Sequence, residues 1–135
     1  SYIIRKAHEY GISDNIKLID RLPRSELFRV LSKCSVYIQP SLFDAFPIAV
    51  VEAMALGSVP VVTKYVGSND IITKVDANLV TDLSPRSMAR IIIELLNNDS
   101  LLRDLGRSVR EVVGEYLSES NVVKQVSSLI TQCLE

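Results

Sequence analysis

The sequence lacks the residues on which several common classes of function depend. Its two cysteines, Cys34 and Cys133, are far apart, so they cannot build a disulfide framework or a Cys-rich zinc site. A reducing cytosol is therefore the expected compartment. There is also no excess of positive charge, because 15 Lys and Arg stand against 16 Asp and Glu. A domain that binds a nucleic-acid backbone usually carries a basic excess, so we expect no nucleic-acid partner.

Long apolar runs and glycine-rich nucleotide motifs are missing as well. No run approaches the ~18 apolar residues of a transmembrane helix, and residues 1–5 do not have the layout of a signal peptide. The chain contains no G-x-G-x-x-G or Walker P-loop motif, which argues against dinucleotide or ATP binding. The single histidine, His8, has no second ligand or nucleophile as a partner, so we interpret it as a surface or half-buried residue.

The residues that are present are typical of one folded domain. Of the 135 residues, 47% are hydrophobic and 23% charged, which is enough apolar material for a core. Apolar runs predict strands at 16–19, 36–39, 59–63 and 78–80, and helical periodicity predicts helices at 2–10, 24–33, 47–56, 69–73, 87–96, 100–116 and 121–134. Short strands that alternate with helices indicate βαβ units. The expected fold class is therefore α/β, a Rossmann-like parallel sheet flanked by helices.

The last three predicted helices each carry an apolar stripe that indicates a buried face. The helix at 87–96 is expected to bury Leu96 with its other apolar residues. The helix at 121–134 is expected to bury Val122, Val123, Val126, Leu129, Ile130 and Cys133.

The candidate site follows the strand at 36–39, because ligands of open parallel sheets bind at the carboxyl ends of the strands. Two carboxylates, Asp44 and Glu52, lie in this stretch, and Glu52 is the only charged residue between Ala45 and Leu56. Glu52 either faces solvent or pairs with a nearby Lys or Arg, or it accepts hydrogen bonds from ligand hydroxyls such as a vicinal diol. Asp44 is either a turn or capping residue or a second sugar contact. The helix start offers N–H groups to a diphosphate, although Pro47 removes one of them.

A longer pattern runs through this stretch: Pro40-Ser41-x-x-Asp44-Ala45-Phe46-Pro47, then Glu52-Ala53-Met54-Ala55-x-Gly57-x-x-Pro60-Val61-Val62. It resembles the P-S-x-x-E-G-F-G, E-A-M-A and P-V-V signature of glycosyltransferase family 4, the group 1 glycosyltransferases. The similarity continues on both sides and covers essentially the whole chain. It implies that residues 1–135 form a single nucleotide-sugar-binding domain, the C-terminal half of a GT-B fold, incomplete at its N-terminus and ending in helices at 100–134.

The resemblance also implies roles for individual residues. Glu52 falls where the family holds the donor ribose, and Asp44 falls at the catalytic carboxylate that contacts the transferred sugar or its leaving group. The donor-binding residues that it implies are Glu52, Ala45, Phe46, Pro47, Ile48, Gly67, Arg21 and Leu22, with Arg21 and Leu22 near the nucleobase. It implies no metal and no cofactor besides the substrate, a UDP- or GDP-linked sugar. Gly67 with Ser68 either cradles phosphate or forms a simple turn.

The resemblance implies a cytoplasmic, retaining glycosyltransferase of polysaccharide biosynthesis. It would transfer a glycosyl group to a glycan or lipid-linked acceptor that a missing N-terminal domain holds, and membrane contact would come only through that half. This chain alone is then expected to be inactive. Asp44 replaces Glu, and Ala45 and Pro47 replace Gly, which indicates an altered sugar pocket or a weakened activity. The alternative is a non-catalytic nucleotide- or glycan-binding or scaffolding module. A flavodoxin-like regulator lacks support, because no phosphoacceptor Asp follows a first strand.

Overall fold

Three parallel strands form the centre of the protein in a computed structural model that describes residues 1–134, and the side chains of residues 1–125, 127 and 128. The strands are β1 (Val36–Gln39), β2 (Val59–Thr63) and β3 (Val80–Thr81), in the order β1-β2-β3. Every residue of β2 is buried, because β2 has a strand on each side and helices over each face. The expected α/β parallel sheet is confirmed, and two strands have the predicted bounds.

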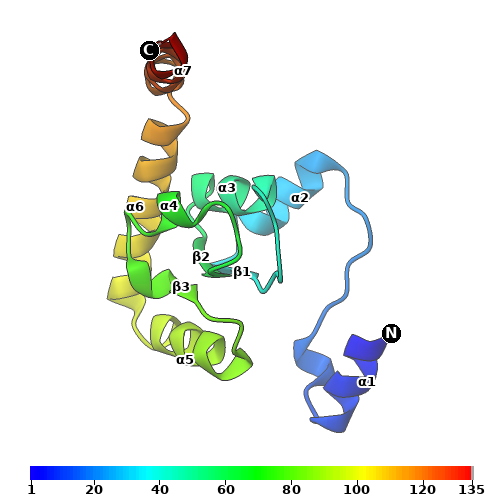
Figure 1. Ribbon diagram of the computed structural model, residues 1–135. Coiled ribbons are helices and arrows are strands. Elements are labelled where there is room, and N and C mark those ends of the chain that lie inside the picture. The colour runs from blue at the N-terminus through cyan, green and yellow to red at the C-terminus, as the bar shows by residue number, and fades with distance from the viewer. Residues whose placement is uncertain (135) are drawn as a thin grey trace.

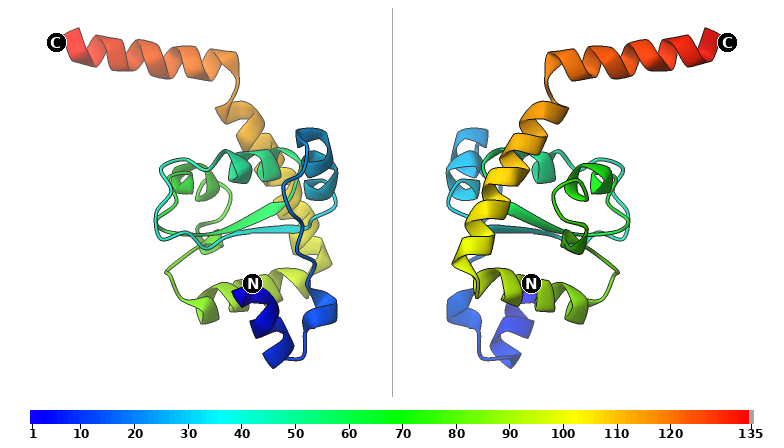
Figure 2. Two further views of the ribbon diagram at one scale, coloured as in Figure 1. Left: turned by 90° about the vertical axis from the view of Figure 1, so that its right-hand side faces the viewer. Right: turned by 90° about the vertical axis from the view of Figure 1, so that its left-hand side faces the viewer.

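Helices cover both faces of this sheet (Figure 1). On one face lie α2 (Arg24–Leu31), α3 (Ile48–Ala55) and α4 (Asn69–Ile72), and on the other lies α5 (Pro85–Leu96). The side views of Figure 2 show the sheet between these layers. The long helix α6 (Asp99–Tyr116) contacts α3, α4, α5 and β2, and so joins the layers at one side. The shared core is apolar and includes Val50, Met54, Val61, Val62, Ile71, Ile72, Leu105, Val109 and Val113.

Two glycines allow α6 to approach the end of α3. Gly57 follows α3 with a φ of +86°, a left-handed conformation that glycine adopts without strain. Gly106 on α6 lies against it, and a Cβ at Gly106 would be only 2.8 Å from the Gly57 carbonyl oxygen. Arg110, one turn further along α6, donates from Nη2 to the Leu56 carbonyl at 3.1 Å. The absence of side chains at these two positions therefore sets the spacing between the two helices.

The strand expected at 16–19 is not formed, and this prediction is wrong. The segment between the 3₁₀ turn η1 (Ser13–Asn15) and α2 is an extended connection away from the sheet (Figure 1). Within the described residues it is paired with no strand, and Ile16, Leu18 and Ile19 are all exposed. Apolar β-branched residues favour extended backbone, but a strand also needs a neighbour to satisfy its N–H and C=O groups. That neighbour is not a local property of the sequence.

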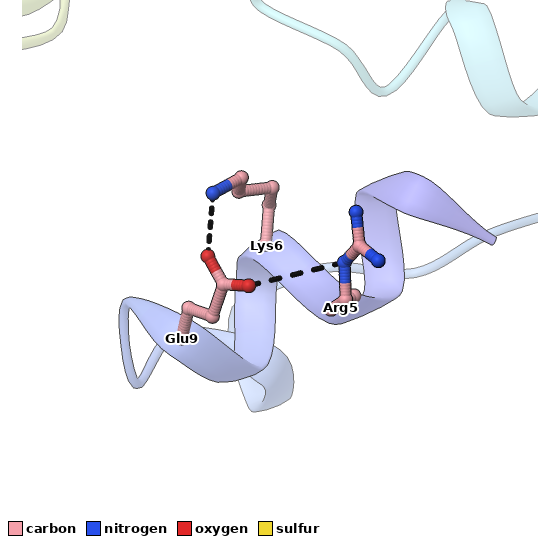
Figure 3. Close-up of polar contacts among 3 residues, drawn as sticks. All are labelled: Arg5, Lys6 and Glu9. Carbon is pink, nitrogen blue, oxygen red and sulfur yellow. Dashed lines mark hydrogen bonds and ion pairs between the residues drawn. The ribbon is translucent and has the colours of Figure 1, made fainter.

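The first helix, α1 (Tyr2–Glu9), contains two ion pairs between its own side chains. Glu9 pairs with Lys6 Nζ at 2.5 Å and with Arg5 Nε at 3.8 Å (Figure 3). Such exposed pairs, three and four positions apart on a helix, contribute about 0.2–0.5 kcal/mol each. Ala7 is the buried residue of α1, and His8 is exposed, as the sequence indicated. Figures 1 and 2 show α1 at the end of the extended connection, outside the sheet layers.

The last helix, α7 (Glu119–Leu134), projects from the end of α6 (Figure 2). Its predicted position is confirmed, but its buried face is not, because the exposed fractions of Val122 and Val123 are 48% and 57%. The other four residues of that expected face, Val126, Leu129, Ile130 and Cys133, lie outside the described side chains. Leu96 at the end of α5 is also exposed rather than buried. An apolar stripe predicts which face of a helix favours burial. Whether that face is buried depends on another element that packs against it.

The remaining differences are small. The other predicted helices occur within two residues of their expected ends. The strand expected at 78–80 begins as a 3₁₀ turn, η2 (Ala77–Leu79), because the Asp76 carboxylate accepts from the Asn78 N–H and closes a turn there. Among residues 1–134, no helix is long and apolar enough to cross a membrane.

Replacement of the two glycines of α6 by alanine should shift stability in opposite directions. Gly106→Ala pushes a Cβ into the Gly57 carbonyl, so we expect the free energy of unfolding to fall by about 1–3 kcal/mol. Gly114→Ala, which meets no atom within 4 Å, should raise it by up to about 1 kcal/mol through helix propensity. Urea unfolding followed by circular dichroism measures both. Equal effects of the two substitutions would contradict the packing described here.

Candidate functional site

A cleft of about 750 Å³ lies between the start of α2 and the first turns of α3. Its walls are Arg21, Leu22, Pro23, Arg24, Leu27, Ile48 and Glu52. α3 starts from the loop that follows the carboxyl end of β1, so the cleft lies where ligands of open parallel sheets bind. Of the residues predicted for the site, the cleft brings together Arg21, Leu22, Ile48 and Glu52.

Glu52 is the central charged group of this cleft. It lies on α3 between Val51 and Ala53, both buried, and its own side chain is 19% exposed. Arg24 donates from Nη2 to Glu52 Oε1 at 2.9 Å. The first of the two interpretations left open for Glu52, a pair with a nearby cation, is therefore found in the structure. The second oxygen, Oε2, has no protein hydrogen-bond partner among the residues described, and it remains available at the cleft wall.

The loop that carries Asp44 is held by a second loop rather than by α3. The Asp44 N–H donates to the Tyr65 carbonyl at 3.2 Å, and the Gly67 N–H donates to the Asp44 carbonyl at 2.8 Å. These bonds form an isolated parallel bridge between Asp44 and Val66. A Cβ at Gly67 would lie 1.7 Å from the Ala45 carbonyl oxygen, so only glycine fits. Gly67 therefore positions the backbone on either side of Asp44.

Asp44 does not cap the helix. The N-cap of α3 is Pro47, and no side chain bonds to the first turn of α3. The capping interpretation of Asp44 is therefore wrong. Its side chain is half-buried beside the carboxyl end of β1, and it does not line the cleft around Glu52. Ala45 and Phe46 are exposed in the same loop, and Pro47 is buried at its end.

Tyr37 of β1 is a residue near the candidate site that sequence reasoning missed. Burial raises the pKa of its phenol above the ordinary 10.0, and the charges of Asp44 and Glu52 raise the pKa further. Both carboxylates are therefore close enough to act on one phenol. The signal lay in the strand alternation, because Tyr37 and Gln39 share a face of β1 and precede the candidate loop.

A chain of hydrogen bonds leads from Tyr37 to the loop. The Tyr37 hydroxyl donates to Gln39 Oε1 at 3.0 Å, and Gln39 Nε2 donates to Ser41 Oγ at 2.8 Å. The Ser41 carbonyl also accepts from Thr63 Oγ1 of β2 at 2.5 Å. Ser41 is thus hydrogen-bonded to both β1 and β2, and these bonds fix the start of the loop that carries Asp44.

Among the described residues, no group of three or more His, Cys, Asp or Glu side chains gathers closely enough to hold a metal ion. The chemistry that this site offers is that of carboxylates, a phenol, backbone N–H groups and the arginines of the cleft.

A sequence model of the family described as glycosyl transferases group 1 matches residues 1–112. The chain belongs to this family. The resemblance seen in the pattern from Pro40 to Val62 is thereby confirmed. The match includes the cleft, the Asp44 loop and the whole of β1, β2 and β3.

Individual relatives agree with this membership. The chain is 30% identical over 129 residues to the MMP alpha-(1->4)-mannosyltransferase of Mycolicibacterium hassiacum, covering 93% of this chain and 31% of that protein. It is 28% identical over 130 residues to the D-inositol 3-phosphate glycosyltransferase of Corynebacterium glutamicum, covering 95% of this chain and 31% of that protein. This chain thus spans about a third of the length of these curated relatives.

A solved structure shares the fold. Sucrose-phosphate synthase from Thermosynechococcus elongatus superposes with a TM-score of 0.80 and 22% sequence identity, covering 98% of this chain and 33% of that one. The similarity extends over α1 and the C-terminal helices as well as the sheet. The expected Rossmann-like α/β fold is confirmed by this likeness.

The raised pKa of Tyr37 predicts a loss of stability at alkaline pH. In the unfolded chain this phenol ionises near pH 10, whereas the folded chain retains its proton to higher pH. The contribution of Tyr37 to the free energy of unfolding is therefore complete below pH 10. It is lost as the pH rises through the pKa of the folded state. Tyr37→Phe should remove this part of the alkaline slope, while it costs about 0.5–1.5 kcal/mol at neutral pH through the lost hydrogen bond to Gln39.

Urea unfolding of the wild type and Tyr37→Phe, at neutral pH and above pH 10, measures this difference, with tyrosinate absorbance to follow ionisation. Tyr10→Phe, in which an exposed ring loses its hydroxyl, controls for the removal of a phenol. An alkaline slope that is the same in the wild type and Tyr37→Phe would contradict the prediction.

Proposed function

We propose that this chain is the donor-binding part of a glycosyltransferase and binds a nucleoside diphosphate sugar in the cleft between α2 and α3. The observation that carries the proposal is the convergence of Glu52, Ile48, Arg21 and Leu22 on one cleft of about 750 Å³. This volume is within the range of roughly 300–1,000 Å³ that small-molecule sites occupy.

Each part of the cleft suits one part of such a donor. The Glu52 carboxylate has two acceptor oxygens, which match the two hydroxyls of a ribose diol. Leu22, Leu27 and Ile48 supply apolar surface for a base, and Arg21 adds a cation beside it. The arrangement combines a mostly apolar wall with a few directional polar groups, as ligand sites do.

The start of α3 suits the diphosphate. The N–H groups of Ile48 and Ala49 have no partner among the described residues, since α3 has no side-chain cap. The positive end of the helix dipole favours negative charge at this place. Pro47 has no backbone N–H, so the site offers the diphosphate one hydrogen-bond donor fewer than it would with another residue at this position. The loop of Ala45 and Phe46 would then pass beside the sugar.

Asp44 is proposed as the catalytic carboxylate that contacts the transferred sugar or its leaving group. Gly67 supports this role indirectly, because it holds the Asp44 backbone at 2.8 Å. Asp is one methylene shorter than Glu, which the family uses here, so the sugar must approach the loop more closely. Charge on the diphosphate leaving group would be stabilised by amides and cationic side chains rather than by a metal ion.

The reaction proposed for the longer protein is transfer of the glycosyl group with retention. The acceptor would be a glycan or a lipid-linked glycan in the cytoplasm, bound by the part of the relatives' length that this chain does not span. The names of the relatives, a mannosyltransferase and a D-inositol 3-phosphate glycosyltransferase, support glycosyl transfer as the reaction class. The 135 residues alone would bind donor without turnover.

Calorimetric titration of UDP, GDP and their sugar conjugates tests the proposal. Glu52→Gln should weaken binding by about 1.5–3 kcal/mol, roughly ten- to a hundredfold, because it removes a charge-assisted contact. Glu26→Gln, which removes an exposed charge from α2 outside the cleft, is the matched control and should leave binding unchanged.

Two results would overturn parts of this proposal. If the wild type and Glu52→Gln bind nucleotides equally well, Glu52 is not part of the binding site. If no nucleotide binds, the cleft is not a donor site. Donor binding without transfer in a longer protein that includes the acceptor half would favour the alternative, a non-catalytic binding or scaffolding module. The replacement of two loop glycines by Ala45 and Pro47 is the feature that favours that alternative.

A further inference from the structure

The Arg24–Glu52 ion pair occupies one oxygen of the carboxylate that the proposed donor needs. We propose that Arg24 is an autoinhibitory residue of the cleft, which occupies Glu52 Oε1 until a ligand with two vicinal hydroxyls displaces it. The inference rests on the proposed function, since it assumes that Glu52 receives a ribose.

The position of Arg24 is unusual for a cation. Arg24 is the first residue of α2, next to the N-cap Pro23, where the helix dipole disfavours positive charge. The Glu52 carboxylate, at 2.9 Å from Nη2, supplies the negative charge that the helix end does not. This distance is that of a direct charge-assisted hydrogen bond. The pair therefore holds Arg24 over the cleft against the local preference of its helix.

The pair and a diol compete for the same atoms. A ribose diol bound by a carboxylate uses both oxygens, one for each hydroxyl. Arg24 uses Oε1, and only Oε2 is left without a protein partner among the described residues. A ligand with one hydroxyl can bind Oε2 alone, whereas a diol also needs Oε1 and must share this oxygen with the arginine or displace it. Arg24 should therefore lower the affinity for diols specifically.

Arg24 is the partner that can move. Its side chain is 76% exposed, whereas that of Glu52 is 19% exposed and lies on a helix packed into the core. The guanidinium of Arg24 also lies 5.1 Å from the centre of the Phe28 ring, within the range of a cation–π contact. This ring, one turn along α2, contacts the guanidinium while it is paired with Glu52. Displacement of Arg24 from Glu52 requires rotation of this exposed side chain.

The diol preference of the cleft gives a direct test. Calorimetry measures the dissociation constants of UDP and 2′-deoxy-UDP, and of GDP and 2′-deoxy-GDP, for the wild type and Arg24→Gln. The quantity compared is the ratio of the deoxy to the ribo constant, because a general loss of attraction between a cation and a diphosphate cancels in it. Exposed ion pairs are weak, so we expect this ratio to rise about two- to fivefold in Arg24→Gln.

A matched variant and a change of salt complete the experiment. Arg29→Gln removes the same charge from an exposed position of α2 outside the cleft, and its ratio should equal that of the wild type. Salt screens exposed ion pairs. Added salt should therefore raise the ratio in the wild type and leave that of Arg24→Gln unchanged.

The outcomes separate this inference from the proposed function. If Glu52-dependent binding is found but the ratio in Arg24→Gln is unchanged or lower, Arg24 does not compete with the diol and the inference is wrong, while the donor cleft stands. If no nucleotide binds to the wild type or to Arg24→Gln, the donor cleft and the inference are both overturned.

Discussion

The burial of β2 on both faces is the constraint on which the rest of this structure depends. Its five residues are all buried, and its neighbours β1 and β3 take its hydrogen bonds on each side. Because all three strands are parallel, the chain must return across a face of the sheet after each one, and α3 and α4 do this. The loops that leave the carboxyl ends of β1 and β2 then lie side by side, and Gly67 joins them at Asp44.

The candidate site follows from this packing and from one charge within it. α3 is an apolar helix whose buried residues belong to the core, so Glu52 reaches the surface only at the cleft. A partly buried carboxylate needs a partner, and α2 supplies one in Arg24. Tyr37 adds a neutral phenol whose pKa is raised by burial and by both carboxylates. The site thus combines two carboxylates with two arginines of the cleft, Arg21 and Arg24.

Much of this could be predicted from local patterns, and the failures have a common cause. The strand at 59–63 was predicted with its bounds because a continuous apolar run of that length is typical of a strand covered on both faces. The strand at 16–19 and the buried face expected around Val122 were wrong, because each requires a neighbour that a local pattern does not contain. The capping role predicted for Asp44 was wrong for a similar reason, since its backbone is hydrogen-bonded to Tyr65 and Gly67 in a loop further along the chain.

By itself the sequence determined the α/β class, the order of the elements from α2 onward and the position of the two carboxylates, because hydrophobic periodicity and short motifs are local properties. The family signature added the expected meaning of Glu52 and Asp44. Only the tertiary structure decided that Glu52 meets Arg24, that Gly67 touches the Asp44 loop, and that Tyr37 lies within reach of both charges. These contacts join residues far apart in the chain, and they exist only once helices pack on both faces of β2.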